Sequence, residues 1–350
     1  MKTICVILAM LLHTYLCEAK DFYVSPNGSD NNPGTKEQAF ATLAYARDQV
    51  QLWNQSNATE DITVWLSGGV FNLSETLVFG LDYSAKHGQK ITWSALPGKV
   101  PVINSDVTIS GWKKLGKSPE GLPRIARGKI WVAPVPESAS GLKTIYNSEG
   151  MLPRARTKVF KHLRESSDQQ GPEDVYKTIP FEKGTTDKLF LPGNAEIVVV
   201  PDRPWTMCIL PVESVDHETG MVSLGASSTY GLAAPRWYME PEVIWVENSF
   251  AGLDEPGEWV YDDDKDLLYY WPQDDKKPGD DIVVPQLIEM IRVEGGIDYD
   301  GPTDNPVQGL KLGMAVRGKT IRTSPRRIFV LLRKMEFSMP SCWLLQARIF

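Results

Sequence analysis

The sequence predicts an all-β protein with one short helix near its start. Its 25 Pro, 28 Gly and 11 Trp residues suit short strands, tight turns and sugar-stacking surfaces better than a bundle of helices. Short apolar runs recur roughly every ten to fifteen residues, and each is followed by Gly, Pro, Asn or Ser. One early stretch has instead the three-and-four spacing of an amphipathic helix.

Residues 1–19 are expected to be a secretory signal peptide, because Lys2 precedes an apolar run that extends to about Leu16 and ends at Ala19. The run is too short for a stable membrane anchor. We therefore expect export to the periplasm or the extracellular space, without stable membrane insertion. Removal of this segment leaves Cys208 and Cys342, which we expect to be free thiols.

Residues 20–112 are expected to form an N-terminal cap and a first series of strands. Phe22–Val24 is a short strand that leads into a Pro- and Gly-rich loop at 26–34. The helix follows, and its apolar stripe consists of Phe40, Leu43, Ala46, Val50 and Trp53. Strands are then predicted at 62–66, 76–79, 91–93, 100–103 and 107–109. Their spacing fits both the sides of β-helix coils and the strands of a β-sandwich.

Residues 113–285 have longer strands and longer loops, which indicates a separate antiparallel unit. Asp262–Asp266 is the acidic turn of a predicted hairpin with arms at 258–261 and 267–271. Further strands are expected at 129–132, 196–200 and 243–246. The earlier pattern returns in residues 286–312, with strands at 288–293 and 307–312.

Several ordered motifs resemble secreted right-handed parallel β-helix proteins of the pectate-lyase-like, carbohydrate-active kind. The opening motifs of this type are Phe22–Asp30, Asn32–Thr35, Phe40–Leu43 and Ala46–Asp48. The more specific ones are Gly68–Phe71, Ala95–Gly98, Ile109–Trp112, Pro153–Arg156, Leu253–Trp259 and Leu268–Pro272. In this order they resemble the group around glycoside hydrolase family 141, in which a β-sandwich is inserted between early coils.

The resemblance implies early coils of a right-handed parallel β-helix with an N-terminal capping helix, and an inserted antiparallel β-sandwich at 113–285. It also implies a glycoside hydrolase that acts on plant or algal cell-wall polysaccharide. In such families the acid and base carboxylates lie on later coils, which are not found in this sequence, so no catalytic residue is carried over and enzymatic activity stays open. A polysaccharide lyase and a non-catalytic, adhesin-like glycan-binding module are the alternatives.

Four residues are candidates for glycan contact. Arg154 and Arg156 point to the same face if they lie in a strand, where they could grip a uronate carboxylate or hold the insert to the coils. Trp237 and Trp245 could stack on a pyranose ring or pack internally. No other residue of the sequence is singled out as a glycan contact.

Metal, cofactor and nucleic-acid binding are not expected. His87, His162 and His217 are too far apart to form a short metal-ligand pair, and the acids at 262–264 lie in a turn where solvated carboxylates are usual. The sequence has no phosphate-binding glycine loop and no nucleophile elbow. Its net charge of −7 argues against broad affinity for nucleic acid.

Residues 313–350 differ abruptly from the rest. They contain eight basic residues against one acid, Glu336, and they have no Asp or Asn and no Gly after Gly318, although the turns of coils depend on these residues. We interpret them as out-of-frame or truncated sequence, with a basic appendage for an acidic partner as the alternative. Since the early coils would then lack the next turn as a cover, we expect this chain to be marginally stable and catalytically inert.

Overall fold

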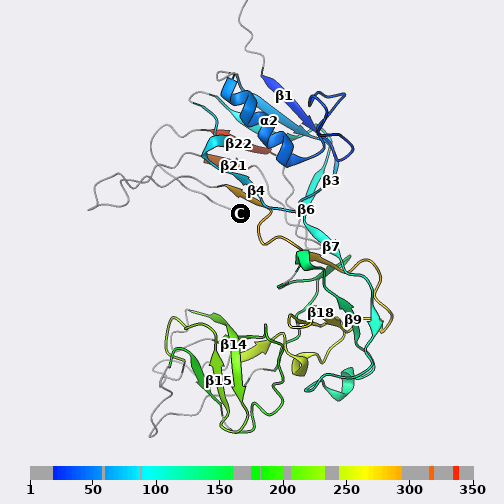
Figure 1. The fold of residues 1–350 in the computed structure, drawn as a ribbon, viewed down its shortest axis with the longest axis vertical. Helices are drawn as coiled ribbons and strands as arrows, with labels where there is room; N and C mark the ends of the chain where they lie inside the picture. The colour runs from blue at the N-terminus through cyan, green and yellow to red at the C-terminus, as the bar shows by residue number, and fades with distance from the viewer. Residues whose placement is uncertain are drawn as a thin grey trace, which may run out of the picture. The chain divides into compact units, whose positions relative to one another are not determined.

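The computed structural model describes residues 19–56, 60–86, 89–139, 141–158, 160, 175–181, 183–199, 206–232 and 244–293, and the backbone of 315–318 and 334–338. These residues are predominantly β with one α-helix, as predicted (Figure 1). They form two compact units: unit 1 comprises the described residues up to Ser105 and from Leu287 onward, and unit 2 comprises those from Asp106 to Gln286. None of the described helices is long and apolar enough to cross a membrane.

Unit 1 contains all the parallel pairs of named strands that the described residues form. In its main sheet β1 (Lys20–Val24), β2 (Ile62–Leu66) and β5 (Ile91–Ala95) run parallel. Two further parallel pairs join β3 (Gly69–Asn72) to β6 (Pro101–Asn104) and β4 (Leu77–Phe79) to β20 (Ile291–Val293). On the free edge of β5 lies β22 (Lys334–Ser338), antiparallel to it, followed by β21 (Ala315–Gly318).

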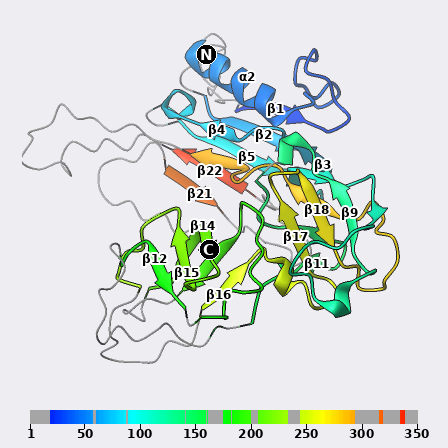
Figure 2. The ribbon, with the colours of Figure 1, turned by 60° about the horizontal axis from the view of Figure 1, so that its bottom comes forward.

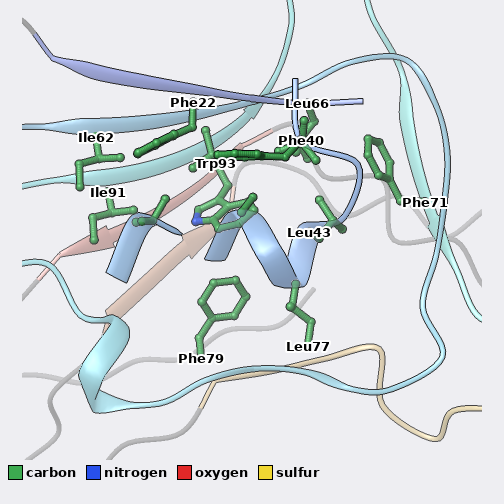
Figure 3. Close-up of a cluster of buried hydrophobic side chains, with 14 of the residues drawn as sticks. Phe22, Phe40, Leu43, Ile62, Leu66, Phe71, Leu77, Phe79, Ile91 and Trp93 are labelled. Atoms are coloured by element: carbon green, nitrogen blue, oxygen red, sulfur yellow. The ribbon is translucent and has the colours of Figure 1, made fainter. Parts of the chain in front are cut away.

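The core of unit 1 is formed by buried residues of the helix α2 (Leu43–Ser56), of the three parallel strands of the main sheet, and of β3, β4 and β6. The predicted stripe is confirmed for Leu43, Ala46 and Val50, which are buried, whereas Phe40 precedes the helix and forms a bridge with Val24. Aromatic rings pack against one another in this core (Figure 3). Phe22 stacks on Phe40, and Trp93 meets Phe79 edge-on with 5.4 Å between ring centroids. Alternate residues of β2 point into this core, as expected for a strand with one buried face.

Unit 2 consists of three antiparallel sheets (Figure 2). The five-stranded sheet has the order β12 (Thr178–Pro180), β15 (Met221–Leu224), β14 (Cys208–Asp216), β13 (Glu196–Val199) and β16 (Ile244–Glu247). A four-stranded sheet has the order β17 (Trp259–Asp262), β18 (Leu267–Tyr270), β9 (Trp131–Pro134) and β8 (Lys113–Lys114). Another has the order β11 (Gly150–Met151), β10 (Tyr146–Asn147), β19 (Val283–Pro285) and β7 (Asp106–Thr108).

The hairpin predicted around Asp262–Asp266 is confirmed, because β17 and β18 pair with Trp259 opposite Tyr270. Asp266 has a φ of 50°, a left-handed conformation that Asp adopts more readily than most residues. Short 3-10 helices occur at Leu81–Tyr83 (η1), Arg124–Ala126 (η2), Glu137–Ala139 (η3) and Phe250–Gly252 (η4).

The strand expected at 107–109 was predicted to belong to the first series of strands, but it belongs to unit 2. β7 pairs antiparallel with β19 in unit 2, and Ile109 is buried in the same cluster as Trp112. The strand expected at 307–312 lies outside the described residues, as does Cys342. Cys208 is a buried free thiol, as predicted.

Candidate functional site

The candidate residues Arg154 and Arg156 lie in a segment that extends the edge of the five-stranded sheet in unit 2. Thr157 donates its backbone N–H to the carbonyl of Val246 at 2.9 Å, and the segment forms a bridge between Arg156 and Glu247. Ala155 and Thr157 are buried while Arg154 and Arg156 alternate with them. Both arginines are therefore on one face, as the sequence predicts for a strand.

Arg154 meets two carboxylates that sequence reasoning did not single out. Glu196 on β13 and Glu247 on β16 are directly opposite each other in the antiparallel register. Nη1 of Arg154 donates to Oε2 of Glu196 and lies 3.7 Å from Oε2 of Glu247. Nζ of Lys143 donates to the other oxygen of Glu196 at 2.8 Å. The result is a cross-strand pair of acids bridged by cations.

The guanidinium of Arg154 is largely enclosed by the chain itself. Its side chain is 10% exposed, its Cζ lies 5.9 Å from the ring centroid of Trp259, and Nη2 donates to the carbonyl of Asn194 at 3.4 Å. Nε is buried and has no hydrogen-bond partner among the described residues. These contacts leave little of the guanidinium open to a bound uronate.

Arg156 and Trp245 form a more accessible pair on the same surface. Arg156 is exposed, and its Cζ lies 5.5 Å from the ring centroid of Trp245. The indole Nε1 of Trp245 donates to Glu247 at 3.0 Å, and the side chain is only partly buried. The arginine thus covers part of the ring on which a sugar would stack. Trp237 lies outside the described residues.

The electrostatics of Glu196 do not suit the role of a general acid. Burial opposes ionisation of Glu196, but the hydrogen bonds and charges of Arg154 and Lys143 outweigh it and lower the pKa of this carboxyl. Glycoside hydrolysis with two carboxylates requires one of them to stay protonated as the general acid. The arrangement is that of an ion-pair network between strands.

One carboxyl of the described residues does have a clearly raised pKa. Burial raises the pKa of Glu258 to about 6. The carboxylate accepts the backbone N–H groups of Asp254 and Glu255, both at 2.9 Å, which closes the loop before β17. A pKa near 6 is compatible with a general acid, but the contacts of Glu258 are with its own loop.

The acidic turn after β17 brings three carboxylates close together. Asp262, Asp263 and Asp264 each offer an oxygen within 4.8 Å of the others. The sequence led us to expect solvated acids, but Asp262 is only 2% exposed, because it ends a buried strand and pairs with Lys265. Among the described residues this is the group whose oxygens could hold a hard cation.

Comparison with known proteins shows that the fold of this chain is similar to that of a solved structure. No family model matches the chain. An uncharacterized protein of Bacillus subtilis (strain 168), YwoF, is 38% identical over 89 residues, which are 25% of this chain and 15% of that protein. A solved structure titled "Glycoside hydrolase" aligns with a TM-score of 0.59 at 21% identity, over 79% of this chain and 48% of that one. The chain therefore spans about half of that structure and a small part of YwoF.

A second solved structure, XylC in complex with xylose, aligns over 80% of this chain and 34% of its own, at 18% identity and a TM-score of 0.30. At this TM-score the alignment carries no argument. The first alignment shows that the described β architecture is similar to that of a glycoside hydrolase structure.

Proposed function

We propose that this chain is part of an exported carbohydrate-active protein, built as early coils of a right-handed parallel β-helix with unit 2 inserted into them. The observation that carries the functional part is the fold likeness to a glycoside hydrolase structure at a TM-score of 0.59. Since a fold hosts many functions, this likeness supports a substrate class and no particular reaction.

The strand pairing in unit 1 supports the architectural part of the proposal. β2, β3 and β4 follow one another closely in the sequence, and each pairs in parallel with a later strand: β5, β6 and β20 respectively. This is the pattern expected when three sides of one coil stack on the three sides of the next. Unit 2 lies in the sequence between β6 and β20, so it would interrupt the second coil before its third side.

The two carboxyls with shifted pKa values in unit 2 that lie in buried surroundings, Glu196 and Glu258, do not identify a catalytic pair for glycan cleavage. Arg154 and Lys143 lower the pKa of Glu196, so this carboxyl does not suit the role of a general acid. The carboxylate of Glu258 is hydrogen-bonded within its own loop. Hydrolysis of a glycan is the reaction proposed first for the whole protein, and cleavage by a polysaccharide lyase is the alternative. An adhesin-like module that binds glycan without turnover is the second candidate, since the contacts of Glu196 and Glu258 fit structural roles.

The test is to incubate the purified chain with a panel of plant and algal polysaccharides that also includes chitosan, a polymer of glucosamine. Retention in affinity electrophoresis, with neither reducing sugar nor ultraviolet-absorbing unsaturated product released, is the expected result. Failure to retain any glycan would refute the carbohydrate assignment. Turnover that disappears when one acid is replaced would instead place an active site within these 350 residues.

Export is tested separately. Expression of the chain with and without residues 1–19, followed by N-terminal sequencing of the exported product, is expected to show cleavage near Ala19. Retention of the uncleaved chain inside the cell would contradict the prediction of a secretory signal peptide.

A further inference from the structure

Unit 2 contains a polar cavity of about 290 Å³ that is separate from the arginine cluster. Asn147 and Tyr270 line it as buried residues, and Glu149, Asp274, Asp281 and Lys277 line it as exposed ones. We call it the acidic cavity, because three of these four exposed side chains are carboxylates.

The floor of the acidic cavity offers a hydroxyl with no partner. Tyr270 ends β18 and is 4% exposed, yet none of the described residues forms a hydrogen bond with its hydroxyl. Burial, together with the charges of Asp281, Asp274 and Glu149, raises the pKa of Tyr270 to about 12. The hydroxyl therefore keeps its proton and can donate a hydrogen bond to a ligand in the cavity that Tyr270 lines.

The walls of the cavity carry excess negative charge in a fixed arrangement. Asn147 accepts the backbone N–H groups of Glu149 and Gly150 at 2.9 and 3.1 Å, which fixes the turn that carries Glu149. Asp274 pairs with Lys276 at 3.3 Å. Within the described part of the chain, no cation pairs with Glu149 or Asp281. Lys277 alone adds a positive charge to the lining.

We propose that the acidic cavity binds a single sugar residue that carries a protonated amine. This inference rests on the proposed function and names a ligand class for it. The volume of the cavity lies just below the usual range for ligand pockets, which is about 300–1,000 Å³. It therefore leaves room for a single sugar ring. Carboxylates accept hydrogen bonds from sugar hydroxyls and from an ammonium group, and the Tyr270 hydroxyl supplies a donor. The same charges repel a uronate.

The experiment is calorimetric titration of the full chain with glucosamine, glucose, glucuronate and butylamine, below the pKa of the sugar amine. Glucosamine is expected to bind about tenfold more tightly than glucose, as one charge-assisted hydrogen bond provides. Glucuronate is expected not to bind. Equal affinity for glucose and glucosamine, or affinity for butylamine equal to that for glucosamine, would overturn the proposal.

Variants locate the binding. Tyr270→Phe removes the hydroxyl and keeps the ring, and Glu149→Gln removes one exposed charge, so each is expected to weaken glucosamine binding about tenfold. Tyr269→Phe is the matched control, because Tyr269 is the preceding residue of β18 and packs edge-on against Phe250 in a different cluster. Unchanged affinity in both variants would refute the site.

The polysaccharide panel distinguishes this inference from the proposed function. If the chain retains glycans and Tyr270→Phe and Glu149→Gln leave glucosamine binding unchanged, the acidic cavity is not the site and the carbohydrate assignment stands. If no glycan and no monosaccharide binds at all, the proposed function itself is refuted.

Discussion

Replacement of Arg154 by Leu should destabilise unit 2 through the two acids that it bridges. Glu196 and Glu247 face each other across adjacent strands, with side chains 17% and 27% exposed. Breaking a buried ion pair by removing one partner costs about 3–5 kcal/mol, and like charges directly opposite are themselves unfavourable. Because both carboxylates keep some solvent contact, we expect the free energy of unfolding to fall by about 3 kcal/mol, the lower end of this range.

The assay is urea unfolding followed by tryptophan fluorescence, which reports on Trp245 and Trp259 beside the cluster. Arg156→Leu is the matched control, since Arg156 is exposed on the same segment and its loss should change the free energy of unfolding by about 0.5 kcal/mol or less. Combining Arg154→Leu with Glu196→Leu should restore part of the lost stability, because the double variant no longer has two like charges directly opposite each other at positions 196 and 247.

The difference between Arg154→Leu and the unchanged chain should also depend on pH. Folding lowers the pKa of Glu196 from its ordinary value of 4.5. The stabilisation is therefore present above that value and is lost as the pH falls through the lowered pKa. An unfolding midpoint in urea equal to that of the unchanged chain at neutral pH would refute the stabilising role. It would leave Arg154 available as a uronate contact.

Two further predictions concern the loop before β17 and the short helix η4. Since folding raises the pKa of Glu258 from 4.5 to about 6, the native state holds an extra proton in this window and stability falls as the pH rises through it. Glu258→Gln should abolish that dependence and raise the free energy of unfolding at pH 7.5 by at most about 2 kcal/mol; an unchanged pH slope in urea unfolding would contradict it. Gly252→Ala should lower the melting temperature, because the new Cβ would lie 2.2 Å from the carbonyl carbon of Arg156 and overpacking costs about 1–3 kcal/mol or more. Gly116→Ala, with nothing within 4 Å of the added carbon, is the control, and equal melting of the two variants would refute the clash.

Local sequence patterns were sufficient for most of the individual elements. The strand at 62–66 is found as predicted, since alternate apolar residues face one core. The hairpin of β17 and β18 was predicted from its acidic turn, because turn chemistry and strand arms lie within one short segment. The helix was predicted from its stripe, although it begins at Leu43 rather than at Phe40.

Pairings between distant segments could not be predicted in the same way. The opposition of Glu196 and Glu247 depends on the register between β13 and β16, which no local pattern encodes. Tyr270 and Glu149 meet at one cavity for the same reason. The local pattern of β7 is that of another strand of the first series. Its pairing with β19 is what shows that it belongs to unit 2.

The chain enters unit 2 through β7 and leaves it through β19, and these strands pair with Asp106 opposite Pro285. The pairing of these two strands affects the order in which the two units fold. Closing a flexible loop of about 180 residues would cost about 4–5 kcal/mol in chain entropy. Once unit 2 has folded, that closure is already made, and Leu77 and Ile291, more than 200 residues apart in sequence, are separated by roughly 30 residues of free chain. The pairing of β4 with β20 then becomes a nearly local event, so unit 2 is expected to fold first and to speed the completion of unit 1.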